Sequence, residues 1–178
     1  MALHFRLGPV KNGEFLRVSG PQQGSNCRRW VKGLPAEAFD HLFALCDAEL
    51  AARGAVRRLA DGGVPCRVSL ADAEPGEEVL LVHYEHHPVN TPYRSSFAVY
   101  VRAGDKTYDA VDEVPAQLRK RMLSVWGYDG DGMMVDTDLV DGRELEGAIE
   151  RIFAEPRIAY LHLHFAKPGC YAARVERA

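Results

Sequence analysis

Two histidines and a cysteine lie close together near the end of the chain and are the clearest candidates for chemistry. They are His162, His164 and Cys170, within the segment AYLHLHFAKPGCYAARV. In a strand, residues two positions apart point to the same side, so both imidazoles are expected on one face and the leucines on the other. An imidazole pair on one face suits a base or a metal ligand, and a nearby thiol suits a nucleophile or a further ligand.

Three interpretations of the histidine pair remain open. His162 and His164 bind a metal such as zinc, they line a metal-free pocket, or they lie on a half-exposed polar strand face without a role. Zinc is not favoured, because two ligands do not make a site. The residues that could complete a site are Cys170, His86, Glu85 and Cys66.

A second histidine-rich segment, VHYEHHP, ends another predicted strand. Alternation places His83, Glu85 and His87 on one face, and Tyr84 and His86 on the other. A carboxylate beside imidazoles suits a metal site or an acid–base pair. Histidines at a solvated strand end need no such role, and both explanations remain open.

Arginines and tyrosines on the same strands are candidate ligand-binding residues, since a guanidinium pairs well with a carboxylate or phosphate. A disulfide between Cys66 and Cys170 requires their strands to be neighbours. The candidate site therefore comprises His164, Cys170 and His86 as catalytic residues, Tyr84, Arg94, Tyr171 and Arg174 as ligand-binding residues, and His162 with His164 as metal ligands.

The elements that must position these residues are mainly strands. Runs rich in β-branched and aromatic residues are AVRRL, PCRVSL, EVLLVHYEH, SSFAVYVR, RIAYLHLHF and CYAARVER. Their short connections favour antiparallel pairing, and Lys167-Pro168-Gly169 predicts a turn between the last two. Helices are expected from Pro35 to Cys46, where Cys46 lies in an apolar stripe, then from Asp47 to Gly54, over 115–122, and between Asp141 and Pro156.

These elements predict an α+β fold. We expect one domain over residues 30–178, with a largely antiparallel sheet, two to four helices packed on it and a C-terminal β-hairpin. Residues 1–29 form an extension, in which the sequence favours a hairpin followed by a loop.

Bulk properties exclude several classes of protein. The 178 residues carry a net charge of −3, which gives no support to nucleic-acid binding. The sequence contains no apolar run long enough to cross a membrane and no signal pattern at its start, which favours a cytoplasmic protein. Its four cysteines are widely spaced and are expected to be free thiols.

The chain from Trp30 onward resembles a bacterial family known as domain of unknown function 1203 (DUF1203). The resemblance rests on LPAEAFDHLFAL, PCRVSLADAEPGEEVLLVHYEH, PYRSSFAVYVR and HLHFAKPGCYAARVERA. It implies that residues 1–29 are an extension and that His86 has the better claim than His83 or His87 to a shared role. It brings no activity, since the family is uncharacterised. Cys46 often corresponds to Ser in the family, and Phe165 stands where the family usually has Asn.

Two functional hypotheses follow. The first is a small cytoplasmic protein with a ligand or metal pocket lined by histidine and cysteine, and enzymatic activity is left open. The alternative is a non-catalytic interaction module or a homodimeric structural protein. A small molecule or another protein is the expected partner, and neither nucleic acid nor membrane is. The cofactor is left unknown.

Overall fold

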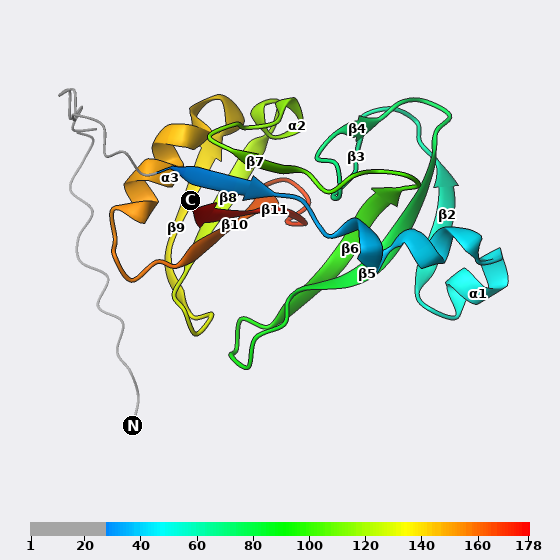
Figure 1. Cartoon of the computed structure of the whole chain (residues 1–178), viewed down its shortest axis with the longest axis horizontal. Helices are drawn as coiled ribbons and strands as arrows, with labels where there is room; N and C mark the ends of the chain where they lie inside the picture. The colour runs from blue at the N-terminus through cyan, green and yellow to red at the C-terminus, as the bar shows by residue number, and fades with distance from the viewer. Residues whose placement is uncertain (1–27) are drawn as a thin grey trace.

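The computed structural model describes residues 28–178, which contain two main antiparallel sheets (Figure 1). The larger sheet has six strands in the order β7-β1-β11-β10-β8-β9. Their bounds are β7 Asp109–Val111, β1 Arg29–Lys32, β11 Tyr171–Arg177, β10 Tyr160–Phe165, β8 Met122–Tyr128 and β9 Met134–Asp141. The predicted C-terminal hairpin is confirmed as β10 and β11, and the α+β class is confirmed.

The smaller sheet has the strand order β2-β5-β6, and a short pair, β3 and β4, lies beside it. The bounds are β2 Ala55–Leu59, β5 Glu78–His87, β6 Ser95–Arg102, β3 Val64–Pro65 and β4 Asp72–Ala73. The chain crosses from β1 toward this sheet through Gly33, whose missing side chain allows close approach. A Cβ there would lie 2.0 Å from the carbonyl oxygen of Val68.

Helix α3 (Leu145–Phe153) covers one face of the larger sheet. Its apolar residues recur at helical spacing and pack with Leu161 and Leu163 of β10 in the largest core cluster. Helix α1 (Asp47–Ala51) adjoins β2 in the smaller sheet, and α2 (Ala116–Arg119) precedes β8. The leucines of β10 thus face α3, as alternation predicts, which turns His162 and His164 toward the opposite face.

Three predictions about elements are wrong. The expected helix from Pro35 to Cys46 is two short 3₁₀ helices, Ala36–Ala38 and Asp40–Ala44, and Cys46 is exposed rather than part of a buried stripe. The run PCRVSL is not a strand beyond Pro65, because the chain turns there. Cys66 N–H donates to the Ala71 carbonyl within this turn, and Arg67 N–H donates to the Tyr100 carbonyl of β6, where the pairing is a single isolated bridge.

The N-terminal prediction lies almost entirely outside the described residues, so its hairpin and loop stay predictions. No helix among residues 28–178 has both the length and the apolar character needed to span a membrane.

Candidate functional site

Four histidines gather where β5 of the smaller sheet meets β10 of the larger one. We call His86, His87, His162 and His164 the histidine cluster. The ring centroids of His87 and His162 are 4.8 Å apart, and those of His86 and His164 are 5.5 Å apart. All four side chains are buried, so the half-exposed strand face considered for His162 and His164 is excluded.

A β-bulge in β5 brings two consecutive histidines into this cluster. Tyr84 pairs with Phe97, but His87 pairs with Ser95, so β5 has one extra residue between these pairs. The predicted alternation, with His83, Glu85 and His87 on one face, is therefore wrong. His83 is exposed, whereas His86 and His87 both point inward.

Aromatic side chains enclose the histidines. Tyr171 stacks on His86 with centroids 4.7 Å apart, and Trp126 stacks on His164 at 3.9 Å. Tyr128 and Tyr160 close the side nearest His87. Burial raises the pKa of Tyr171. The predicted ligand-binding residue Tyr171 is thus a wall of the cluster.

Both ring nitrogens of His87 form hydrogen bonds, whereas some ring nitrogens of the other histidines have no partner among the described residues. Nδ1 of His87 donates to the Tyr93 carbonyl at 2.9 Å, which leaves Nε2 to accept from the Tyr160 hydroxyl at 2.8 Å. Nδ1 of His164 donates to the Gly169 carbonyl at 3.2 Å. Neither nitrogen of His162, nor Nε2 of His164, has a protein partner among the described residues.

Burial disfavours a charge on three of these imidazoles, those of His86, His162 and His164. Desolvation, reinforced by neighbouring histidines, lowers the pKa of His86 and of His164 to about 4. The pKa of His162 falls further below its ordinary value for the same reason, and Arg174 across the hairpin adds to the effect. The histidine cluster contains no carboxylate that could pair with a protonated ring.

The arrangement does not assemble a metal centre from the described residues. No group of three or more His, Cys, Asp or Glu side chains within 28–178 is placed to hold an ion. The rings of the proposed metal pair, His162 and His164, have centroids 6.3 Å apart.

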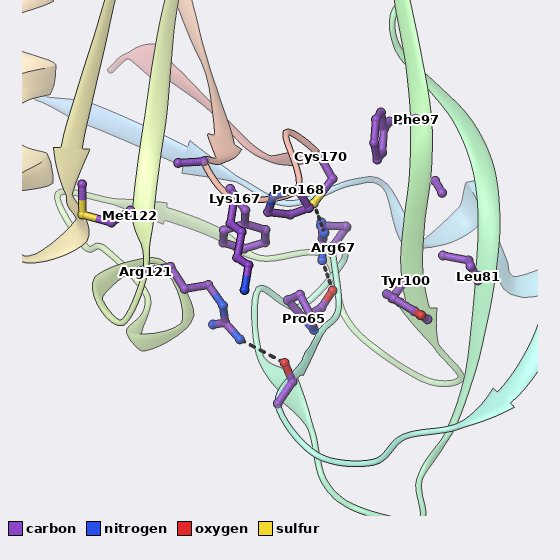
Figure 2. Close-up of a pocket in the computed structure, with 14 residues that line it drawn as sticks. Pro65, Arg67, Leu81, Phe97, Tyr100, Arg121, Met122, Lys167, Pro168 and Cys170 are labelled. Carbon is purple, nitrogen blue, oxygen red and sulfur yellow. Dashed lines mark hydrogen bonds between the residues drawn. The ribbon is translucent and has the colours of Figure 1, made fainter.

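Cys170 lines a pocket of about 580 Å³ between the two sheets, and none of the four histidines is among the residues that line it (Figure 2). Phe97, Leu81 and Tyr100 of the smaller sheet form one wall. The hairpin turn and the start of β8 face them. The lining residues of this Cys170 pocket are Gly63, Pro65, Arg67, Leu81, Phe97, Ala98, Tyr100, Arg121, Met122, Phe165, Ala166, Lys167, Pro168 and Cys170.

Arg67 forms the base of the Cys170 pocket and is 2% exposed. Its Nε donates to the Tyr171 carbonyl at 2.6 Å, Nη1 donates to the Pro65 carbonyl, and Nη2 donates to Sγ of Cys170 at 3.1 Å. Burial lowers its pKa, although arginine stays charged in proteins. No carboxylate of residues 28–178 forms an ion pair with this buried cation.

The charged lining of the pocket is entirely cationic. Arg121 pairs with Asp72 at 2.9 Å and also donates to carbonyls, so part of its charge is offset. Lys167 is exposed on the hairpin turn and extends toward Pro65 (Figure 2). No Asp or Glu belongs to the described lining. The pocket therefore combines apolar walls with an excess of positive charge.

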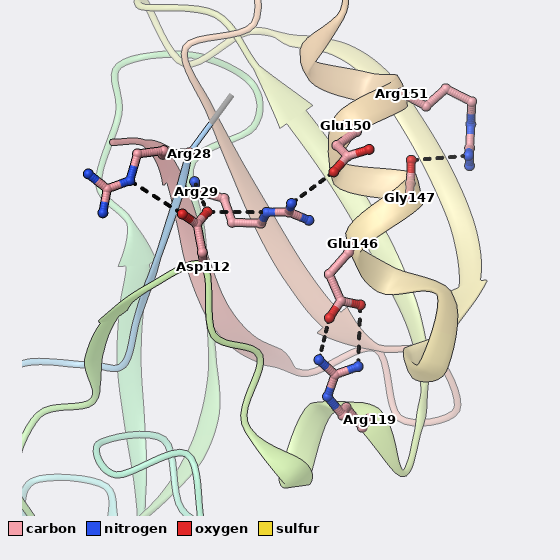
Figure 3. A network of polar contacts seen from close by, with 8 residues as sticks. All are labelled: Arg28, Arg29, Asp112, Arg119, Glu146, Gly147, Glu150 and Arg151. Atoms are coloured by element: carbon pink, nitrogen blue, oxygen red, sulfur yellow. Dashed lines mark hydrogen bonds and ion pairs between the residues drawn. The ribbon is translucent and has the colours of Figure 1, made fainter. Parts of the chain in front are cut away.

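In a second group of charged residues, beside β1 and α3, the arginines are paired with carboxylates (Figure 3). Arg28 pairs with Asp112 at 3.3 Å, and Arg29 pairs with Glu150 at 2.8 Å. Arg119 pairs similarly with Glu146. These contacts tie β1 and α2 to neighbouring elements and leave little free positive charge for an anion.

The remaining candidate residues are dispersed. Arg94 pairs with Glu85 on the surface and is not among the residues that line the Cys170 pocket. Arg174 lies over the Tyr160 ring and pairs with Glu176. Tyr84 packs on Phe39.

The two inner thiols are not joined. Cys66 and Cys170 are both free, so the disulfide considered between them is absent. Cys66 is fully buried, and desolvation raises its pKa to about 11. The combined histidine–cysteine site expected from sequence is therefore two sites: Cys170 lines a pocket, and the histidines do not.

Sequence reasoning missed Arg67, Arg121 and Lys167 as pocket residues. One signal was present for Arg67: a charged residue flanked by Cys66 and Val68 is conspicuous if the run is buried. For Lys167 and Arg121, the sequence carries no comparable signal, because surface cations are common. His87 was judged less important than His86, since its inward direction depends on the bulge.

Comparison with known proteins adds a family and no activity. No curated protein matches the chain, and no solved structure matches it. Residues 63–177 match the model of a family described as "Protein of unknown function (DUF1203)". The match includes Arg67, Lys167, Cys170 and the whole histidine cluster, and it confirms the resemblance seen in the sequence. The chain belongs to the DUF1203 family.

Proposed function

We propose that the protein binds a small organic anion with an apolar body in the Cys170 pocket. One observation carries this proposal: an apolar pocket between the two sheets has only cations among its charged lining residues. Ligand sites are typically concave and mostly apolar, with a few polar groups that orient the ligand, and about 580 Å³ suits a small molecule.

The apolar body would lie against aromatic side chains. Phe97 lines the pocket and is 41% exposed, and Phe165 and Tyr100 line other parts of it. Covering such surface with an apolar ligand contributes roughly 25 cal/mol per Å². The walls therefore favour an aromatic or branched body over a purely polar one.

The anionic group would lie near Lys167 and Arg67. Lys167 has no carboxylate partner within the described chain, and Arg67 is buried without a counter-charge. A charge pair in a partly desolvated site is worth several times its value in water. A carboxylate would offset both cations, whereas a neutral analogue of the same shape would not.

Calorimetry with a matched acid and amide tests this function. We expect 4-phenylbutyrate to bind about tenfold or more tightly than 4-phenylbutyramide. Lys167→Met should weaken binding of the acid and leave the amide unchanged. Lys106→Met is the control, because Lys106 is also exposed but lies outside the pocket lining. Equal affinity for acid and amide, or no binding of either, would contradict the proposal.

The partner in this proposal is a small molecule, and we place the protein in the cytoplasm. The free thiols of Cys46, Cys66 and Cys170 support a reducing compartment. The pairing of Arg28, Arg29 and Lys32 with carboxylates argues against a nucleic-acid surface.

A second candidate is a homodimer formed through β2, the edge of the smaller sheet. Val56 and Leu59 of this strand are 45% and 72% exposed, and an uncovered edge can pair with a second copy. The mass in solution tests it: Leu59→Lys should convert a dimer into a monomer. A wild-type protein that is monomeric at high concentration would exclude this candidate.

A further inference from the structure

We propose that Cys170 is a nucleophile that forms a covalent bond to a small carboxylate carrying an electrophilic carbon next to its carboxylate group. The proposal rests on the anion pocket proposed above and adds the reaction that its thiol performs. The reacting atom is Sγ of Cys170, at the base of the pocket beside Arg67.

The first argument is the missing counter-charge of Arg67. A buried charge without compensation costs several kcal/mol, so buried guanidinium groups are normally paired with carboxylates. Here the acceptors are two carbonyls and the sulfur of Cys170. The sulfur is the acceptor among these three that can become negatively charged. The thiolate is the reactive form of cysteine.

The second argument is access combined with charge. Cys170 is 7% exposed and is one of the residues that line the pocket. A carboxylate directed toward Lys167 would hold the adjacent carbon near the same hairpin turn. Binding the reactant beside the nucleophile increases its effective concentration, and this accelerates bond formation.

The other thiols differ in the features that the proposal requires. Cys66 is fully buried, its Sγ lies 3.9 Å from the Val64 carbonyl oxygen, and burial raises its pKa to about 11. Cys46 is exposed before α1, where Glu49 accepts from its backbone N–H and Asp47 pairs with Arg57. Cys46 is therefore a matched control: it is accessible to reagents and lacks the cationic lining of the Cys170 pocket.

No histidine takes part in this step. Sγ of Cys170 accepts a hydrogen bond from Arg67, whereas the next residue, Tyr171, stacks on His86. The proton of the thiol passes to water. Sulfur then forms a bond to the electrophilic carbon, and the bond from that carbon to its leaving group breaks, with the electron pair departing on the leaving group. The product is a thioether whose carboxylate remains beside the cations.

Iodoacetate and iodoacetamide test the proposal, because the two alkylating reagents differ in charge. Each forms the same sulfur–carbon bond and releases iodide. The full chain is treated at pH 7.5, and the rate at each cysteine is measured by peptide mass spectrometry. We expect the ratio of the iodoacetate rate to the iodoacetamide rate to be about tenfold higher at Cys170 than at Cys46. Lys167→Met should lower that ratio severalfold at Cys170 and leave Cys46 unchanged.

Unfolding in urea provides the control for intrinsic reactivity, since all cysteines should then show the same ratio. A native Cys170 that resists both reagents, or that shows the ratio of Cys46, would overturn the proposal. The test is separable from the proposed function. If 4-phenylbutyrate binds while Cys170 is inert, the anion pocket stands and the nucleophile fails. If Cys170 prefers iodoacetate while 4-phenylbutyrate does not bind, the nucleophile stands and the proposed ligand class fails.

Discussion

Two neighbouring residues, Cys170 and Tyr171, belong to opposite kinds of environment. Cys170 lines an open pocket whose charged residues are all cations. Tyr171 packs against the histidine cluster, whose four side chains are buried. The difference shows how two successive residues of one hairpin can face different environments. Histidines close in sequence to a thiol need not line the same pocket when the backbone turns them to another side.

The same burial has different consequences in the two regions. In the cluster, desolvation lowers the pKa of His86 and of His164 to about 4, so these rings shed their charge. In the pocket, Arg67 keeps its charge, because the pKa of arginine is too high for burial to remove the proton. Burial therefore disfavours the charge of these two histidines, whereas the pocket keeps cationic side chains in its lining.

The largest expected effect separates the regions by packing. Tyr171→Ala should lower the free energy of unfolding by about 3–5 kcal/mol, because it leaves a cavity beside the histidines. Phe97→Ala in the pocket should cost about 1 kcal/mol or less, since Phe97 is 41% exposed. Urea denaturation at pH 7.5 measures both. Similar costs for the two variants would contradict the division into a sealed and an open region.

Acid should destabilise the protein through the cluster. The unfolded chain takes up protons near the ordinary histidine pKa of 6.5, whereas folded His86 and His164 take them up only near 4. The free energy of unfolding should therefore be highest above pH 6.5. It should fall by up to about 1.4 kcal/mol per pH unit for each such histidine between pH 6.5 and 4. Urea denaturation at pH 7.5, 6 and 5 measures the slope, and a flat profile would refute neutral burial.

Removing one histidine ring tests how much each buried histidine contributes to the loss of stability in acid. His162→Leu removes two ring nitrogens that have no protein partner, so stability at pH 7.5 should change by about 1 kcal/mol or less. The acid slope should decrease by the contribution of one histidine. His87→Leu is the matched control: it breaks bonds to Tyr93 and Tyr160 and should cost about 1–3 kcal/mol. Equal costs at pH 7.5 would show that the hydrogen bonds do not distinguish these histidines.

The smallest expected effect concerns Arg94, which the sequence nominated as a ligand contact. Its ion pair with Glu85 is on the surface, and such pairs contribute little to stability. Arg94→Ala should leave 4-phenylbutyrate affinity and the acid slope unchanged. A loss of affinity in calorimetry would place the ligand near the β5–β6 connection instead of the Cys170 pocket.

Local patterns were sufficient for much of the fold. Alternation in YLHLHF correctly placed Leu161 and Leu163 opposite His162 and His164, since the strand is regular there. Turn residues correctly predicted the final hairpin, where Gly169 adopts a positive φ of 73°. The strand predicted for PCRVSL is wrong beyond Pro65. A composition rich in β-formers does not reveal that long-range backbone hydrogen bonds hold this segment in a turn.

The site was less predictable, since it depends on contacts between distant segments. Arg67 reaches Cys170 across 103 positions, and no local pattern encodes such a pair. The bulge that turns both His86 and His87 inward reflects pairing with β6 and packing on β10, which alternation within β5 cannot show. Sequence therefore identified chemically capable residues, including Cys170, but assigned them to one site where the fold makes two.

Protection of Cys170 from alkylation is the most direct test of the central claim that this thiol lies in an anion-binding pocket. Iodoacetamide is neutral, so its rate at Cys170 reports access rather than attraction. Saturating 4-phenylbutyrate should slow alkylation of Cys170 and leave exposed Cys46 unaffected. An unchanged rate at Cys170, or an equal slowing at both cysteines, would contradict the account.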